Sequence, residues 1–241
     1  MTATAPENIH KSRGRLFPKS AIPLAGCRRC PRLATYRKEN KASAPSWHNG
    51  AVPPLGAADA RLLILGLAPG RRGANRTGHI FHGDASGAFL FTGLLNAGLA
   101  TGVYDGVSPQ SLWLPGIAMT NAVACAPPGN APTSAEFDQC AAYLRALVRA
   151  MRDLRVVLAL GGQAHGAFLR TMGVKRAAFP FAHGAAHDLT VSGRKIPKHA
   201  SGHIRLMNSY HCSQQNTRTG RLTPAMFARI LAEVKRQLPG P

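Results

Sequence analysis

Short apolar runs alternate with longer segments of helical periodicity along most of this chain. The apolar runs are followed by turn-forming residues, often Gly or Pro, a pattern typical of buried strands. They predict strands at residues 61–65, 116–124, 156–160 and 204–209. The longer segments predict helices at residues 86–97, from a cap at 133 or 134 to 151, 163–172, and 223–238.

This order of elements predicts the fold class. Strands that alternate with helices form parallel sheets covered on both faces. We therefore expect an α/β protein, a single-domain three-layer sandwich whose central, mostly parallel, four-stranded sheet is flanked by helices. Ser86 is the expected cap of the first helix, and Glu136 lies in the first turn of the second, where the helix dipole favours a carboxylate.

Composition and charge indicate the partner. The chain has 241 residues, 45% of them hydrophobic, which suffices for one domain with a proper core. We expect a basic N-terminal arm at 1–20 and the domain at 21–241. Lys and Arg outnumber Asp and Glu by 30 to 10, a formal charge of +20. The excess is spread along the chain, which favours nucleic acid as the partner over a charge that merely aids solubility.

The sequence also indicates where the protein works. The first residues lack the continuous apolar stretch of a signal peptide, and nowhere do about 18 apolar residues run together. We expect a protein with no membrane partner that is soluble and cytoplasmic, associated with the bacterial nucleoid.

The five cysteines have three interpretations. Cys27 and Cys30 form a Cys-X-X-Cys pair, Cys125 and Cys140 lie far downstream, and Cys212 stands beside a histidine. In a reducing compartment such residues indicate metal binding or catalysis rather than disulfides. A [4Fe–4S] cluster, a zinc site and inert buried cysteines remain open on spacing alone.

Polar residues follow the predicted strands where an α/β fold places its ligands. A glycine-rich loop at 66–78 follows the first strand and leads to Asp84. Around the end of the second strand lie Asn121 and Asn130, and His211 follows the fourth strand. The carboxyl ends of parallel strands share one edge of the sheet, so these side chains should converge. Individually, Asp84 can cap a helix, Asn130 can make a turn and His211 can be structural.

The sequence also bears on two function classes other than catalysis on nucleic acid. A nucleotide hydrolase is disfavoured, because the glycine-rich loop lacks the Lys followed by Ser or Thr of a P-loop. A non-catalytic, metal-stabilised nucleic-acid-binding module would explain the charge and the cysteines, but it gives the polar residues no reason to converge.

Three long motifs resemble those of the family 5 uracil-DNA glycosylases, often called UDGb. The first covers residues 66–70, 73–78 and 81–87, the second 125–133 and the third 209–223. The resemblance implies a uracil-DNA glycosylase-like fold and a [4Fe–4S] cluster bound by Cys27, Cys30, Cys125 and Cys140. Cys212 falls at a variable position of the third motif and is not expected to be a ligand.

The resemblance also implies the reaction. Such an enzyme rotates uracil out of DNA, at roughly a few kcal/mol of unstacking, and hydrolyses the N-glycosidic bond to leave an abasic site. The sugar gains positive charge and the departing base negative charge. Asp84 fits the first role and His211 the second, with Asn130 bonding the base edge or positioning water. Deaminated purines such as hypoxanthine are further expected substrates.

The remaining site residues also follow from the resemblance. Phe81 is expected to stack on the flipped base, and Asn121 is a secondary candidate for base contact. The expected substrate-binding loop is Gly66, Leu67, Ala68, Pro69 and Gly70. The expected DNA contacts are Asn75, Arg76, Ser213, Gln214, Gln215, Asn216 and Arg221, with the loop at 213–219 entering the minor groove. We expect a monomer acting on DNA that contains uracil or other deaminated bases.

Some segments depart from the family pattern. His79 and His82 stand where other residue types are common, and residues 47–50 match poorly. The basic stretch at 194–203 looks like an insertion, and as a solvated loop it would need no function.

Overall fold

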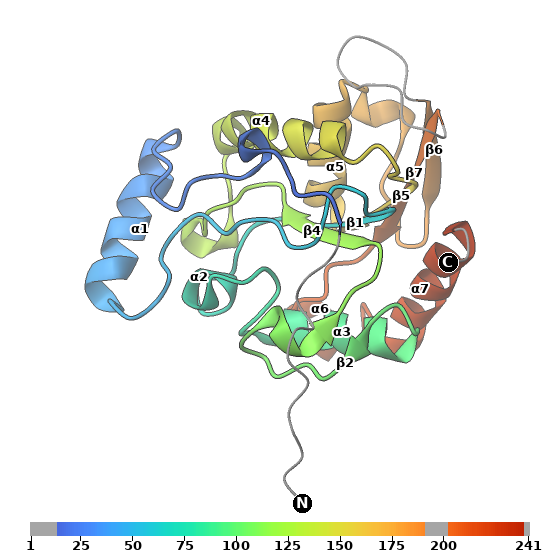
Figure 1. Ribbon diagram of the computed structural model, residues 1–241, viewed down its shortest axis with the longest axis horizontal. Coiled ribbons are helices and arrows are strands. Elements are labelled where there is room, and N and C mark those ends of the chain that lie inside the picture. The colour runs from blue at the N-terminus through green and yellow to red at the C-terminus, as the bar shows by residue number, and fades with distance from the viewer. Residues whose placement is uncertain (1–13, 191–201, 239–241) are drawn as a thin grey trace, which may run out of the picture.

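The computed structural model describes residues 14–190 and 202–238, which form three layers with a sheet as the middle layer (Figure 1). The sheet has five strands in the order β4-β1-β5-β7-β6. Four of them pair in parallel, and β6 pairs antiparallel with β7 at one edge. The main strands are β1 (Leu62–Gly66), β4 (Ile117–Asn121), β5 (Val156–Leu160), β6 (Ala186–Thr190) and β7 (His203–Ser209).

Most of the longer helices form the two outer layers, whereas the first of them lies to one side of the sheet (Figure 1). The longer ones are α1 (Pro31–Ser43), α3 (Ala85–Asn96), α4 (Ser134–Ala150), α5 (Gly162–Met172) and α7 (Pro224–Gln237). The minor elements are η1 (Lys19–Ala21), α2 (Ala74–Thr77), β2 (Thr101–Gly102), η2 (Pro109–Ser111), β3 (Leu112–Trp113), η3 (Pro128–Asn130), η4 (Arg176–Ala178) and α6 (Gln214–Arg218). No helix in the described ranges is long and apolar enough to span a membrane.

The strand pattern creates two cores, one on each face of the sheet. Every residue of β1 is buried. Leu62 and Ile64 pack with α3 and α7, whereas Leu63 and Leu65 pack with α4 and α5. Because successive side chains of a strand point to opposite faces, a fully apolar strand needs cover on both. The predicted α/β sandwich is confirmed.

The structure corrects the number of strands. The four predicted strands are present, β5 with the predicted bounds and the others with shifted ends, and β6 is a fifth strand of this sheet that the sequence did not indicate. Only Leu189 of β6 is buried, since the strand lies at an edge and most of its residues face solvent. An edge strand of this kind lacks the apolar run that revealed the others.

The helix caps are partly as predicted. Thr133 caps α4 and forms a capping box with Glu136. For α3 the predicted cap was wrong: Asp84, not Ser86, is the N-cap, and its Oδ1 accepts a hydrogen bond from the Gly87 N–H at 3.0 Å. The carboxylate therefore caps α3, which was the alternative to a catalytic role for this residue.

The helix α1 was missed because its buried face is mostly polar. Leu33, Arg37 and Asn40 are its buried residues, at helical spacing, but only one is apolar. Amphipathic patterns are recognised by apolar residues at these positions. The helix is therefore held to the rest of the molecule by polar contacts as well as by Leu33.

Residues 14–20, which we assigned to the N-terminal arm, contact the domain. Arg15 donates hydrogen bonds to the carbonyl oxygens of Ala58 and Ala150, and Phe17 packs against a core cluster. The rest of that arm and most of the basic stretch at 194–203 lie outside the described residues.

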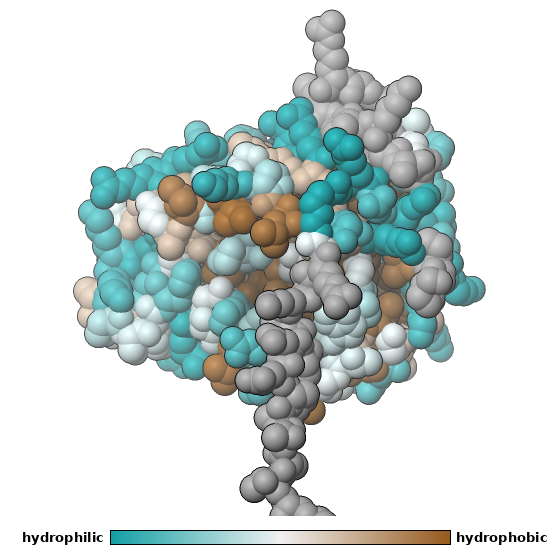
Figure 2. Space-filling view, in the orientation of Figure 1, coloured by the Kyte–Doolittle hydropathy of each residue, from teal (hydrophilic) through white to brown (hydrophobic). Residues whose placement is uncertain are grey.

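Figure 2 shows a largely hydrophilic face with hydrophobic patches between the polar residues. In the described ranges, Arg37 is the only Lys or Arg that is buried. The positive charge of the other described cations is thus carried at the surface, whereas Arg37 needs a partner inside the protein.

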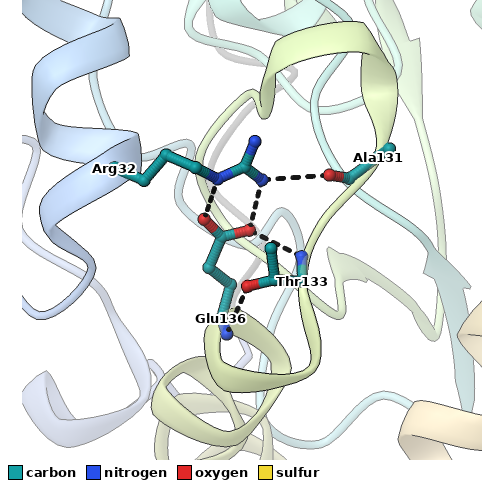
Figure 3. A network of polar contacts seen from close by, with 4 residues as sticks. All are labelled: Arg32, Ala131, Thr133 and Glu136. Carbon is teal, nitrogen blue, oxygen red and sulfur yellow. Dashed lines mark hydrogen bonds and ion pairs between the residues drawn. The ribbon is translucent and has the colours of Figure 1, made fainter.

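Glu136 joins α1 to α4 (Figure 3). Its carboxylate receives two hydrogen bonds of 2.8 Å from Arg32, whose guanidinium also donates to the Ala131 carbonyl at 3.0 Å. The Thr133 N–H donates to Glu136 at 2.8 Å. Burial raises the pKa of Glu136, but the bonds from Arg32 and Thr133 outweigh burial and hold the pKa below its ordinary value.

We expect Glu136→Ala to lower the free energy of unfolding at pH 7 by about 1–2 kcal/mol, because the capping box and the Arg32 contact are lost. A carboxyl with a lowered pKa stabilises the fold above its unfolded pKa, and the contribution disappears as pH falls. The loss should therefore shrink in acid. Urea unfolding at pH 7 and pH 4 tests this, with the exposed Glu39→Ala as control; equal losses for both variants would contradict it.

Candidate functional site

The site lies at the carboxyl ends of the parallel strands. Gly66 ends β1 and is paired in register with Asn121, which ends β4. Leu160 and Ser209 end β5 and β7 and are likewise paired. His211 follows β7 by two residues. The register thus brings the loops after these strands to one edge of the sheet, as the sequence predicted.

Phe81 and Asn121 lie together directly above Gly66. A Cβ atom on Gly66 would collide with Asn121 Oδ1 and would lie 2.8 Å from the Phe81 ring. Asn121 is 8% exposed, and its Oδ1 has no hydrogen-bond partner within the described part of the chain. An unpaired buried amide oxygen is unfavourable unless a ligand satisfies it. An aromatic ring and a free amide therefore face the same space.

Phe81 adopts an unusual backbone conformation. Its φ of +55° lies in the left-handed region, which bulky residues rarely occupy. Such conformations persist where the surrounding structure enforces them, commonly at binding and catalytic sites. Gly87 contributes here, because a side chain at Gly87 would collide with the Phe81 carbonyl. The start of α3 therefore leaves room for the Phe81 carbonyl and holds the side chain of Asp84.

Asp84 uses its two carboxylate oxygens differently. Oδ1 accepts the Gly87 N–H, which leaves Oδ2 toward the turn at 70–73. A Cβ on Gly70 would lie 3.0 Å from Oδ2, and one on Gly73 would collide with the carboxylate. The glycines therefore make room for the acid, and the capping bond fixes its orientation.

His211 lies near Asp84, and a hydrogen bond to the His211 carbonyl holds its backbone in place. Asn216 donates a hydrogen bond from Nδ2 to the His211 carbonyl at 2.8 Å. Burial lowers the pKa of His211 below its ordinary value, and the Asp84 carboxylate opposes this only in part. The imidazole is therefore neutral at pH 7 and can donate a hydrogen bond from one nitrogen.

The predicted catalytic role of Asn130 stays a prediction. Asn130 occupies an exposed turn, η3, with a φ of +55°. Its position on η3 agrees with the alternative explanation, in which Asn130 is a turn residue between prolines.

Two predicted DNA contacts point inward instead. Asn75 is fully buried and donates to Asn49 Oδ1 at 3.0 Å, so a direct contact with DNA is excluded for this side chain. The amide of Asn216 is engaged with His211, as described above. Its segment, predicted as a loop, is the helix α6, with Ser213 as N-cap. The sequence could not reveal the direction of these side chains.

Other predicted contacts are available at the surface. Gln214, Gln215 and Arg76 are exposed. Arg221 is also exposed, with its guanidinium 4.6 Å from the centre of the Tyr210 ring. Tyr210 in turn stacks on His183 with ring centres 4.8 Å apart. This stack, which the sequence did not indicate, places a cation and two rings beside His211.

Four cysteines line one small pocket near α1. They are Cys27, Cys30, Cys125 and Cys140, with Pro23, Leu33 and Tyr143 among their neighbours. Burial raises the pKa of Cys30, Cys125 and Cys140 to about 11 each, and every one is raised further by other thiols of the set. Within the described ranges, no three or more His, Cys, Asp or Glu side chains are spaced for a single metal ion.

Cys212 is separate from this pocket. It is 2% exposed and belongs to the hydrophobic core beside α3 and α7. Burial raises the pKa of its thiol to about 12, which keeps it protonated. Its environment is that of a small apolar side chain.

Arg37 extends the cysteine site, and sequence reasoning missed it. Its guanidinium donates to Cys125 Sγ at 3.1 Å and to the Cys27 carbonyl. Arg37 follows Leu33 by one helical turn and precedes Asn40 by another, so the spacing was the only available signal. The buried guanidinium supplies positive charge where thiolates would carry negative charge.

The chain is similar in sequence to one known protein family and to several of its members. Residues 53–235 match the model of the Uracil DNA glycosylase superfamily. The chain is 42% identical to a type-5 uracil-DNA glycosylase of Thermus thermophilus over 219 residues, 88% of this chain and 94% of the relative. It is 41% identical to the Mycobacterium tuberculosis relative of that name, over 88% of this chain and 78% of the other. The Pyrobaculum aerophilum relative is 39% identical, over 92% and 93% respectively.

We expect Gly66→Ala to lower the free energy of unfolding by about 1–3 kcal/mol, because the new methyl group overlaps Asn121 and Phe81. Gly166→Ala is the control, since a Cβ there meets its nearest neighbour at an ordinary 3.6 Å. Urea unfolding of both variants tests this. A Gly66→Ala protein as stable as the parent would show that the space above β1 is not filled as described.

Proposed function

Since the chain belongs to the uracil DNA glycosylase superfamily and, at 42% identity to the Thermus thermophilus protein, to its type-5 members, we propose that it removes uracil from DNA. The reaction hydrolyses the N-glycosidic bond and leaves an abasic site, which begins base excision repair. The observation that carries the proposal is the pairing of Phe81 with Asn121 above Gly66 and of His211 with Asp84, in loops at the strand ends.

Phe81 and Asn121 would hold the flipped base. The ring offers a stacking surface for a planar base. The free Oδ1 of Asn121 suits the N3–H of uracil, and its Nδ2 suits the O4 carbonyl next to it. Hypoxanthine has the same pair on its Watson–Crick edge, an N–H donor beside a carbonyl acceptor. We therefore extend the proposal to deaminated purines of this kind.

Asp84 and His211 would stabilise the two charges that develop as the bond breaks. Asp84 Oδ2 would face the cationic sugar or orient the attacking water, while its Oδ1 stays bound to Gly87. A neutral His211 would donate a hydrogen bond to the base oxygen as negative charge grows there. Preorganised groups of this kind commonly contribute about 3–4 kcal/mol each to transition-state stabilisation.

Asn130 remains the third catalytic candidate, by its place in the second motif. Its exposed position on η3 leaves its side chain accessible to DNA. Arg76, Gln214, Gln215 and Arg221 would contact the DNA backbone around the site, and Ser213 would hold α6 in position for that contact. A chain with a net charge of +20 gains affinity for phosphates without reading sequence, and we propose that it binds as a monomer.

We propose further that Cys27, Cys30, Cys125 and Cys140 bind a [4Fe–4S] cluster. The set has the donor type that iron–sulfur clusters use, and a pocket lined by four thiols suits a group larger than one ion. When bound, the cluster would supply a crosslink between the segments around Cys27 and Cys125. Arg37 would offset its negative charge and orient the Cys125 sulfur.

The proposed activity is tested with a labelled duplex that carries one U·G pair, followed by alkali. We expect strand scission with the parent and an approximately 10²–10³-fold slower reaction with Asp84→Asn. Asn is as good an N-cap as Asp, so the variant should keep the start of α3. Asp153→Asn, an exposed carboxylate, is the control. No scission by a cluster-loaded parent that binds DNA would overturn the assignment and favour the binding module.

The cluster is tested on protein purified without oxygen. We expect about four iron atoms per chain and, for Arg37→Gln, iron loss to a chelator about tenfold faster, because the hydrogen bond to Cys125 is gone. Lys38→Gln, which removes a neighbouring exposed cation, should lose iron at the parental rate. A parent that binds zinc and no iron would refute the cluster.

A further inference from the structure

The turn at 70–73 packs against the Asp84 carboxylate, so the position of this turn affects the position of the carboxylate. Its two glycines border the Asp84 carboxylate, so a shift of the turn would open space beside Oδ2. Within the turn, the N–H groups of Gly73 and Asn75 both donate to the Gly70 carbonyl, at 3.2 and 3.1 Å. These local bonds close the turn but do not fix its place in the molecule.

Arg71 fastens this turn to α1. Its Nε donates to Asn40 Oδ1 at 2.6 Å, and its Nη2 donates to Ser43 Oγ at 3.2 Å. The same guanidinium lies 5.4 Å from the centre of the Trp47 ring. A planar guanidinium held by two acceptors and a ring has one orientation, which a lysine ammonium cannot reproduce.

The helix α1 is itself held in place by contacts with other parts of the molecule. Arg32 pairs with Glu136 of α4, and Arg37 bonds to Cys125. Asn40, the acceptor for Arg71, is 2% exposed and so belongs to the buried face of the helix. The anchor that Arg71 uses is therefore part of the packed structure and is connected to the cysteine site.

We propose that Arg71 is a positioning residue for Asp84: through Asn40 it docks the turn at 70–73 on α1, the helix that Arg37 joins to the cysteine site. This inference rests on the proposed glycosylase function. Arg71 does not contact the reacting atoms in this arrangement. It acts by keeping the glycines of the turn against the Asp84 carboxylate, and small misplacements of a catalytic group can slow a reaction about 10²-fold.

The neighbouring Arg72 gives a matched control. It is exposed, whereas Arg71 is partly buried, and its backbone carbonyl accepts a hydrogen bond from Arg76 Nε. Both residues carry the same charge in adjacent positions. A difference between their variants therefore reports the docking contact rather than attraction of DNA.

The experiment compares single-turnover cleavage of a U·G duplex by the parent, Arg71→Lys, Arg71→Met and Arg72→Met. We expect both Arg71 variants to lower the rate constant of the chemical step about tenfold or more, with the DNA dissociation constant of Arg71→Lys within about twofold of the parent. Arg72→Met should keep the parental rate constant. Parental chemistry in Arg71→Lys would overturn the proposal.

A double-mutant cycle tests the route through Asn40. If Arg71 acts through Asn40, then Asn40→Ala should slow the chemical step similarly, and the double variant should be little slower than either single one. Additive losses would contradict the route. Iron content and thermal unfolding of each variant identify any that fail to fold, in which case Arg71→Lys carries the comparison.

Hydrogen exchange separates this inference from the proposed function. We expect faster amide exchange at residues 73–76 in Arg71→Met than in the parent and Arg72→Met, whatever the enzyme cleaves. An inactive parent would refute the glycosylase function while leaving this result readable. Unchanged exchange in Arg71→Met would refute the docking role even if the parent is active.

Discussion

The site depends on close packing above the carboxyl end of β1. Gly66 has no side chain, and the space that one would occupy is taken by Asn121 from β4 and by the ring of Phe81. The parallel register that pairs Gly66 with Asn121 sets this distance. Phe81 reaches the same point with a φ of +55°, and Gly87 at the start of α3 leaves room for its carbonyl. Backbone strain, strand register and the missing side chain are therefore parts of one arrangement.

Asp84 shows that a structural and a chemical role need not compete. The capping bond to Gly87 takes one carboxylate oxygen and fixes the side chain, while the glycine turn leaves room for the other. The same helix start thus stabilises α3 and orients an acid. Burial lowers the pKa of His211 despite the nearby Asp84, so the pair combines a negative carboxylate with a neutral donor. That combination suits a reaction in which opposite charges separate.

The helix α1 connects the cysteine site to the turn at 70–73. One end carries Cys30 as its N-cap, and its buried face carries Arg37 toward the cysteines and Asn40 toward Arg71. Its ion pair with Glu136 is half exposed on the arginine side and by itself contributes about 0–1 kcal/mol. A buried arginine is unfavourable without an anionic partner, which links the stability of this helix to the state of the thiols. Ala68 of the glycine-rich loop also packs against this cysteine core.

The sequence by itself determined the sheet, its flanking helices and the edge at which the polar loops meet. Apolar runs such as that of β5 and the capping box of Thr133 and Glu136 are local signals, and local physics suffices to interpret them. The tertiary structure alone decided α1 and β6, because a helix buried through Arg37 and Asn40 and an edge strand buried through Leu189 carry little apolar periodicity. It also decided that the amides of Asn75 and Asn216 donate hydrogen bonds within the protein and that Asn130 lies on an exposed turn. The direction of a side chain depends on partners distant in the sequence, such as Asn49 for Asn75, and no local pattern contains them.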